Sequence, residues 1–370
     1  MGAARAVAAG VPAGRSAEAP GSSLSNGTKH VLEESKIDRR RFLRRAFTLG
    51  GGACLGLGAA GCAGRGDGAR VLSLAHGLDT SHPVHRAMVY LADRLAALSS
   101  GALRAEVYPG EQLGSERECL ELLQIGSLSM TKVSASVLES FAPAFAVFNI
   151  PYLFRDRAHE TAVLGGVIGR ELLVSAERFR LRGLAYYDAG SRSFYTRSRA
   201  IAHPDDLAGL KIRTQESPSA IRMVQLLGGS PTPISWGELY TALQQGVVDG
   251  AENNPPSFHL SHHYEVCRWY ALDEHTAVPD VLLIGTATWL DLEEREREWL
   301  EEAAAASAEL QKELWRVATE EALAAVAAAG VEVSRPDKGP FAERVAPFLA
   351  EMAEDPVLGG WVRGVLALAS

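Results

Sequence analysis

The sequence predicts an α/β protein with enough material for two domains. The chain has 370 residues and 47% of them are hydrophobic, so it can bury two cores. Strand and helix patterns alternate through residues 70–134, an order typical of a parallel sheet with crossover helices. An almost unbroken run of helix-forming residues at 293–329 predicts a helix longer than one domain of this size.

Five elements are expected in the first alternating segment. Val84, Met88 and Leu91 repeat at intervals of three and four, which predicts a helix with one apolar face. Ser115 and Glu118 form a capping box, so a second helix is expected to begin there. The predicted order is a strand at 70–76, a helix at 83–98, a strand at 103–107, a helix at 115–126 and a strand at 128–134.

Further elements are expected in the rest of the chain. They are helices from 151 to about 179 and strands at 184–187, 210–214 and 281–284. The long helix at 293–329 would run about 55 Å, at about 1.5 Å per residue, and end at Gly330. The alternative is two helices joined by a kink near residues 306–307.

The strand at 210–214 carries a candidate ligand-binding arginine. Leu210 and Ile212 alternate with Lys211 and Arg213, so the two basic residues are expected on the opposite face from the apolar ones. Arg213 stands near the carboxyl end of the strand, where ligands collect in open α/β sheets. A guanidinium can grip a carboxylate with two parallel N–H donors. The alternative is a surface arginine in an ordinary ion pair.

A second candidate segment lies at residues 247–256. A short apolar run ends in Asp249-Gly250, and the amides Asn253 and Asn254 follow. Asparagine offers both a donor and an acceptor, which suits recognition of hydroxyl or carboxylate groups. The prolines of 255–256 are expected to stop regular structure. The alternative for this segment is an ordinary turn.

The charge distribution argues against a nucleic-acid partner. The net charge is −8, from 37 basic and 45 acidic residues. Residues 1–61 hold nine basic and four acidic residues, a net of +5, so the remainder carries −13. Such a surface repels polyanions. An anionic ligand would therefore have to be bound locally, by a few well-placed arginines.

The first 62 residues are expected to be an N-terminal extension with an export signal. Residues 38–44, DRRRFLR, fit the twin-arginine pattern, and the apolar run at 46–60 is too short to span a bilayer. Residues 59–62, AAGC, resemble a lipobox in which Cys62 would be acylated. Two mature forms stay open, a lipoprotein anchored through Cys62 and a simply cleaved soluble form. A basic amphipathic N-terminus of a cytosolic protein is the third alternative.

Several short motifs in a fixed order resemble one protein family, the DctP-type solute receptors of TRAP transporters. The similarity runs from about residue 70 to the C-terminus. The motifs are Gly190-x-Arg192, Pro204-x-Asp206-Leu207-x-Gly209-Leu210-Lys211-Ile212-Arg213, Gly228-Gly229-Ser230-Pro231-Thr232-Pro233, Glu238-Leu239-Tyr240-x-Ala242-Leu243-Gln244 and Asp249-Gly250-Ala251-Glu252-Asn253.

The resemblance implies a two-lobed periplasmic-binding-protein fold. Such a fold has a hinge, a cleft between the lobes and a long C-terminal helix that braces both. Domain I would comprise residues 70–190 with 279–318, and domain II residues 191–278 with 319–370.

The resemblance also implies a set of ligand-binding residues. Arg213 matches the arginine that clamps the ligand carboxylate, and Arg192 matches a second arginine that reaches it. Ser134 and Val137 stand where the family's glutamate and arginine contacts follow the third strand, which argues against a sialic-acid ligand. The other expected contacts are Asn253, Asn254, Glu116, Trp236, His76 and His82.

Residues 254–257, NPPS, and 263–267, HYEVC, resemble the subgroup that binds sugar acids, chiefly hexuronates such as glucuronate and galacturonate. The implied protein is a monomeric receptor in the periplasm or at the outer face of the cytoplasmic membrane, exported by the twin-arginine route. It would deliver ligand to a permease with a large and a small membrane subunit, without a cofactor, a metal or a catalytic reaction. The alternatives are a C4-dicarboxylate or aldonate receptor and, in a different class, a uronate lyase or isomerase, which would need a positioned general base.

Overall fold

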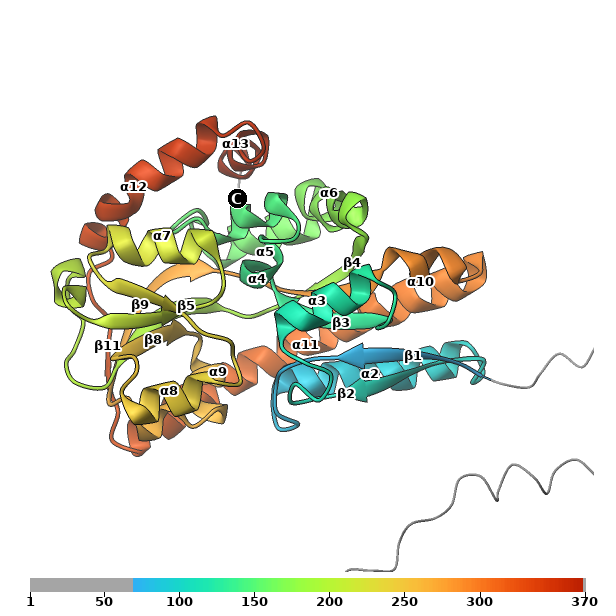
Figure 1. Cartoon of the computed structure of the whole chain (residues 1–370), viewed down its shortest axis with the longest axis horizontal. Coiled ribbons are helices and arrows are strands. Elements are labelled where there is room, and N and C mark those ends of the chain that lie inside the picture. Colours follow the sequence, from blue (N-terminus) through green and yellow to red (C-terminus); the bar gives the residue numbers. More distant parts are fainter. Residues whose placement is uncertain (1–68, 369–370) are drawn as a thin grey trace, which may run out of the picture. The chain divides into compact units, whose positions relative to one another are not determined.

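The computed structural model describes residues 69–368, which form two lobes, each built on its own β-sheet with helices on its faces (Figure 1). The first sheet has the strand order β2-β1-β3-β10-β4, and the second has the order β11-β9-β5-β8-β6-β7. The twin-arginine pattern and Cys62 lie outside the described residues.

The first lobe begins as the sequence predicts, with parallel strands joined by helices. β1 pairs in parallel with both β2 and β3. Ser115 caps the second helix, and its capping box with Glu118 is present. The elements are β1 (Arg70–Ala75), α2 (Pro83–Leu98), β2 (Leu103–Tyr108), α3 (Glu116–Gln124) and β3 (Met130–Ser134).

The rest of the first lobe adds a helical layer and two strands. Strand β10 lies between β3 and β4 and is antiparallel to both. All six of its residues are buried, as expected of a central strand. The elements are α4 (Ala135–Leu138), η1 (Pro143–Asn149), α5 (Arg157–Gly165), α6 (Val167–Ser175), η2 (Ala176–Phe179), β4 (Leu181–Tyr187), β10 (Asp280–Gly285) and α10 (Thr286–Asp291).

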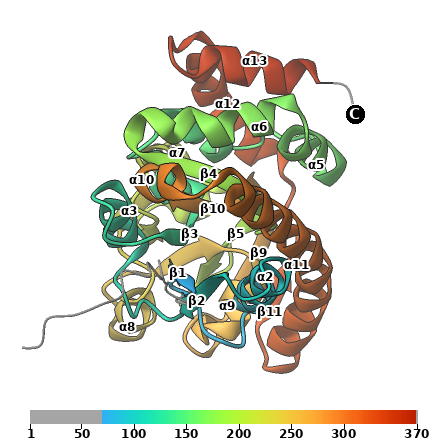
Figure 2. The ribbon, with the colours of Figure 1, turned by 90° about the vertical axis from the view of Figure 1, so that its right-hand side faces the viewer.

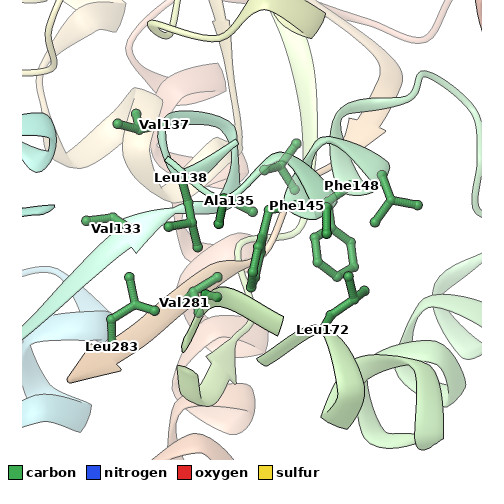
Figure 3. Close-up of a cluster of buried hydrophobic side chains, with 14 of the residues drawn as sticks. Val133, Ala135, Val137, Leu138, Phe145, Phe148, Leu172, Val281 and Leu283 are labelled. Atoms are coloured by element: carbon green, nitrogen blue, oxygen red, sulfur yellow. The ribbon is translucent and has the colours of Figure 1, made fainter. Parts of the chain in front are cut away.

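A large apolar cluster holds these layers together. Val133 from β3 and Val281 from β10 meet Leu138, Phe145 and Phe148 from the following helices (Figure 3). Each of these five side chains is at most 1% exposed. Burial of this kind contributes about 25 cal/mol per Å² of apolar surface, so the cluster stabilises the packing of β3 and β10 against the helices.

The second lobe is a mixed sheet in which β6 pairs in parallel with β7 and β8, while β5 is antiparallel to β8 and β9. Its elements are β5 (Ser191–Thr196), η3 (Pro204–Leu207), β6 (Lys211–Thr214), α7 (Pro218–Leu226), β7 (Ser230–Pro233), α8 (Leu239–Gln245), β8 (Gly250–Asn253), α9 (Pro255–Leu260), η4 (His263–Glu265), β9 (Trp269–Ala277) and β11 (Glu332–Ser334).

The expectation that residues 255–256 stop regular structure is wrong. Pro255 and Pro256 open helix α9, and the Asn254 side chain caps it by accepting a hydrogen bond from the Ser257 N–H at 2.9 Å. Proline is tolerated in the first turn of a helix because its missing N–H would have no intrahelical partner there. The reading of this segment as an ordinary turn is also wrong, because Gly250–Asn253 is a buried strand.

Helix α11 (Glu294–Ala328) is a single helix of 35 residues, so the alternative of two kinked helices is wrong. It packs along α2 and β4 of the first lobe and along α9 of the second (Figure 2). Gly330, with φ of 85°, follows its end. In the described part of the chain, neither this helix nor any other is apolar enough over a sufficient length to cross a bilayer.

The chain passes between the sheets at residues 188–190 and at 278–279, and a third time through α11, which leads from β10 to β11. Two of the predicted domain boundaries lie at the first two passages and the third, between residues 318 and 319, lies within α11; the division stays a prediction. Two terminal helices follow, α12 (Gly339–Glu354) and α13 (Gly359–Ala367). α12 packs on α7 and β9 of the second lobe, but α13 packs on α6 and η1 of the first. The placement of α13 therefore differs from the expected assignment of 319–370 to domain II.

Candidate functional site

A cavity between the two lobes brings together most of the residues that the sequence singles out. Its lining comes from the ends of β3, β6, β8 and β10, from the loops that follow β1, β4 and β7, from the start of α3 and from α11. The predicted residues that line it are Arg213, Arg192, Asn253, Asn254, Glu116, Trp236 and His82.

Arg213 is a buried cation without a counter-ion. Its side chain is carried by β6 into the cavity wall, and the residue is only 2% exposed, whereas Lys211 on the same strand is exposed. The Nε–H donates to the Ile234 carbonyl at 2.8 Å, but the buried Nη1 has no hydrogen-bond partner in the described chain. No described carboxylate forms an ion pair with it. Burial lowers the pKa of Arg213, and the nearby Glu252 opposes this effect.

Arg192 is buried as well, but it is already paired. β5 and β8 are neighbouring antiparallel strands, and this places Arg192 against Glu252. The guanidinium donates to both carboxylate oxygens and to the carbonyl of Glu252, and Nη1 donates to Asn253 Oδ1 at 3.0 Å. Four of its five N–H groups are thereby used, which leaves one on Nη1. The predicted contact of Arg192 with the ligand stays a prediction, restricted to that one donor.

Glu252 also faces His275, which extends the network into the core. The His275 Nε2 lies 3.6 Å from Glu252, and its Nδ1 lies 2.7 Å from Asp273. Burial alone would lower the pKa of His275, but Asp273 and Glu252 raise it to about 9. Burial likewise opposes ionisation of Glu252, yet Arg192 and His275 lower its pKa to about 2. Arg192 with Glu252 and His275 with Asp273 therefore form two buried ion pairs behind the cavity.

The two asparagines have different surroundings. Asn253 Oδ1 accepts from Arg192 Nη1 and from the Asn254 N–H, at 3.0 and 2.9 Å. Asn254 lines the cavity, but its Oδ1 is used in capping α9. The Asn253 side chain thus orients Arg192, and Asn254 positions the start of the helix.

The first-lobe wall is acidic around one lysine. Lys132 Nζ lies 3.0 Å from Glu116 Oε1 and 3.1 Å from Asp280 Oδ2, and all three residues line the cavity. The Ser134 N–H donates to the other Glu116 oxygen at 3.2 Å. Lys132 and Asp280 were not anticipated. The available signal was a charged residue inside or directly beside an apolar strand, at 128–134 and at 281–284.

The histidines do not behave alike. His82 lines the cavity and caps α2. Its burial, and to a lesser degree the positive charge of Lys132, lowers the pKa of His82 to about 3, so the ring is neutral. His76 is not part of the lining. Its Nδ1 accepts from the Leu78 N–H at 3.1 Å, and its Nε2 lies 3.0 Å from the His85 ring. Both ring nitrogens have partners within the first lobe, so His76 has no free ring nitrogen for a ligand and does not line the cavity with the other predicted contacts.

Trp236 stands where the two lobes meet. Its ring packs against the apolar clusters of both lobes and lies 5.3 Å from the His263 ring. The adjacent Gly237 N–H donates to Glu111 Oε1 of the first lobe at 3.2 Å. A second contact between the lobes joins Ser134 to Gln215 at 3.3 Å. These contacts enclose the cavity and partly shield its charges from water.

Comparison with known families gives one match. Residues 74–355 match the model of the bacterial extracellular solute-binding proteins, family 7, also called DctP. The chain is 38% identical over 295 residues to the uncharacterized protein YiiZ of Salmonella typhimurium, which covers 79% of this chain and 90% of the relative.

Solved structures of similar proteins were also found. A TRAP periplasmic solute-binding protein from Xanthobacter autotrophicus, with bound β-D-galacturonate, is 36% identical with a TM-score of 0.78, over 80% of this chain and 100% of that one. A TRAP periplasmic solute-binding protein from Anaerococcus prevotii, with bound α/β-D-glucuronate, is 35% identical with a TM-score of 0.78, over 80% and 97% of the two chains.

Proposed function

The chain belongs to the bacterial extracellular solute-binding proteins of family 7, the DctP family, and we propose that it is a TRAP receptor for a hexuronate such as D-galacturonate or D-glucuronate. The receptor captures the acid in the cavity between its lobes. One carboxylate is bound by Arg213, with the free Nη1 donor of Arg192 beside it. The ring hydroxyls contact Glu116, Asn253 and neighbouring polar groups.

The observation that supports this proposal is the unpaired guanidinium of Arg213. A buried charge without a partner is costly, and proteins retain one where a ligand supplies the opposite charge. A carboxylate at the free Nη1 would satisfy both the charge and the vacant donor. Enclosure of the pair away from water strengthens the interaction, since the effective dielectric constant falls.

The pairing of the charged groups in the cavity favours binding over proton transfer. Glu116 and Asp280 are both engaged with Lys132, and Glu252 is engaged with Arg192. Burial leaves His82 neutral, with a pKa of about 3. A lyase or isomerase would need a general base that is free to take a proton, whereas each of these carboxylates is held in an ion pair. The proposed role is therefore capture and delivery without chemistry.

Delivery and location complete the proposal. A monomeric receptor exported by the twin-arginine route would close on its ligand through hinge motion and release it to a permease with a large and a small membrane subunit. It would act in the periplasm, either free or anchored at the outer face of the cytoplasmic membrane through an acylated Cys62.

The test is a thermal-shift screen of the mature protein against hexuronates, aldonates and C4-dicarboxylates. A ligand that binds only the folded state raises the melting temperature, so galacturonate or glucuronate should give the largest rise. Arg213→Lys should abolish this rise while leaving the fold intact, because an ammonium cannot form the same fork of hydrogen bonds. A strong response to succinate, with none to any sugar acid, would contradict the proposed ligand.

A further inference from the structure

We propose that the first-lobe wall of the cavity makes this receptor selective for acids with a single carboxylate and excludes the matching diacids. This inference rests on the proposed function, and it assigns Lys132, Asp280 and Glu116 as the residues that set specificity.

The cavity offers one position for an anion. Three cationic residues line it, and two already have carboxylate partners in the described structure. Arg192 is held by Glu252, and Lys132 is held by Glu116 and Asp280. Arg213 has none, and its Nη1 is a buried donor without a partner. A first ligand carboxylate therefore has a site on the second lobe, and a second carboxylate has no equivalent on the first lobe.

The first-lobe wall instead presents acceptors. Two carboxylates share one ammonium there, which leaves a local charge of −1. An ionised carboxylate only accepts hydrogen bonds, so Glu116 and Asp280 suit the O–H donors of a sugar. Lys132 spends one N–H on each acid and retains a third for a hydroxyl oxygen. A ligand hydroxyl can donate a hydrogen bond to the carboxylates and accept one from the ammonium, whereas a ligand carboxylate would be repelled by two negative charges.

The two arginines, Lys132 and their carboxylate partners carry charges that add up to zero, and the half-buried Glu216, which also lines the cavity, adds a further negative charge. Arg192, Arg213 and Lys132 contribute three positive charges, and each is at most 6% exposed. The three negative charges are those of Glu252, Asp280 and Glu116, and Glu116 has a side chain that is 14% exposed. One ligand carboxylate takes the cluster to −1 and a second takes it to −2. Each step has to be accommodated largely out of water, so the second is disfavoured.

The experiment compares two acyclic acids that differ only at one end. D-Galactonate carries one carboxylate and a terminal hydroxymethyl group, and galactarate carries a carboxylate at both ends. Dissociation constants for both, and for D-galacturonate, would be measured by calorimetry at pH 7.5. We expect galactarate to bind on the order of 100-fold more weakly than galactonate, since like charges placed together are strongly unfavourable.

The variants Asp280→Asn and Glu116→Gln each neutralise the wall. Either should strengthen galactarate binding about tenfold or more relative to wild type, because one of the two repelling charges is gone. Glu121→Gln is the matched control, since Glu121 lies on α3 with Glu116, pairs with Arg117 and does not line the cavity. It should leave both affinities unchanged.

The outcomes separate this inference from the proposed function. If D-galacturonate fails to bind the wild-type protein, the proposed function is wrong. If it binds, but galactarate binds wild type as well as galactonate does, only the selectivity of the wall is wrong. The selectivity of the wall is also wrong if neither Asp280→Asn nor Glu116→Gln gains affinity for galactarate. Each variant is first checked for a cooperative melting transition. Having two variants covers the case in which one fails to fold.

Discussion

Replacement of Arg213 by methionine should have opposite effects on ligand binding and on the stability of the ligand-free protein. Methionine has a similar length and no charge. It removes the unpaired buried cation, which is 2% exposed, together with the donor to the Ile234 carbonyl. The first change is favourable to the folded state, because a buried charge without a partner is costly. The second is unfavourable, because it leaves one acceptor unsatisfied.

The magnitudes can be worked from these two contacts. Loss of a partner for the Ile234 carbonyl costs about 1–3 kcal/mol. Removal of an uncompensated buried charge returns several kcal/mol. The ligand-free variant is therefore expected to be at least as stable as wild type. Binding should suffer, since truncation of one member of a buried charge pair costs about 2–5 kcal/mol, or roughly 30-fold to several thousand-fold in affinity.

The assay is urea unfolding without ligand and calorimetry with D-galacturonate. Arg222→Met is the control, because Arg222 is a second-lobe arginine with a half-exposed side chain, remote from the cavity, whose ion pair with Glu351 spans 3.9 Å. It should alter neither quantity by much. Destabilisation of the ligand-free Arg213→Met protein by more than about 3 kcal/mol would refute the reasoning, since that exceeds the lost hydrogen bond. Unchanged affinity would refute the assignment of Arg213 as the carboxylate clamp.

Two predictions concern stability. The pKa of His275 is raised from 6.5 to about 9 by Asp273 and Glu252 despite its burial. The protonated His275 therefore contributes its full stabilisation of the folded state below pH 6.5, and this stabilisation is lost as the pH rises through about 9. The free energy of unfolding in urea should fall by up to about 3 kcal/mol between pH 6 and pH 9.5. The His275→Gln variant should lack most of this pH dependence. Gln311→Leu should destabilise by about 2–4 kcal/mol in urea, because Gln311 hydrogen-bonds both the N–H and the carbonyl of Asp188 at 2.7 Å in a buried position. A change below about 1 kcal/mol would show that water replaces the amide.

The fold could be predicted from local sequence signals where those signals are sufficient. The capping box at Ser115 fixes the start of α3, and the uninterrupted helix formers fix α11 as one element. Residues 255–256 misled the prediction, because proline ends a helix in its interior but begins one in its first turn. The difference depends on the preceding residue, Asn254, which caps the helix.

The site was harder to predict because its chemistry depends on pairs that are distant in sequence. Arg192 and Glu252 are 60 residues apart and meet only because their strands are neighbours. Lys132 and Asp280 meet in the same way across β3 and β10. Sequence motifs could place the arginines at the site but could not show which one is already neutralised. That distinction separates Arg213 from Arg192.

The passages of the chain between the sheets at 188–190 and 278–279 border the cavity, with Arg192 two residues beyond the first and Asp280 directly after the second. If the lobes opened about these two passages, the groups next to them would move least. The distance between Arg192 and Asp280 would then change little when the receptor opens. The charge of the acidic wall at Asp280 would therefore already face an incoming acid before the lobes close on it.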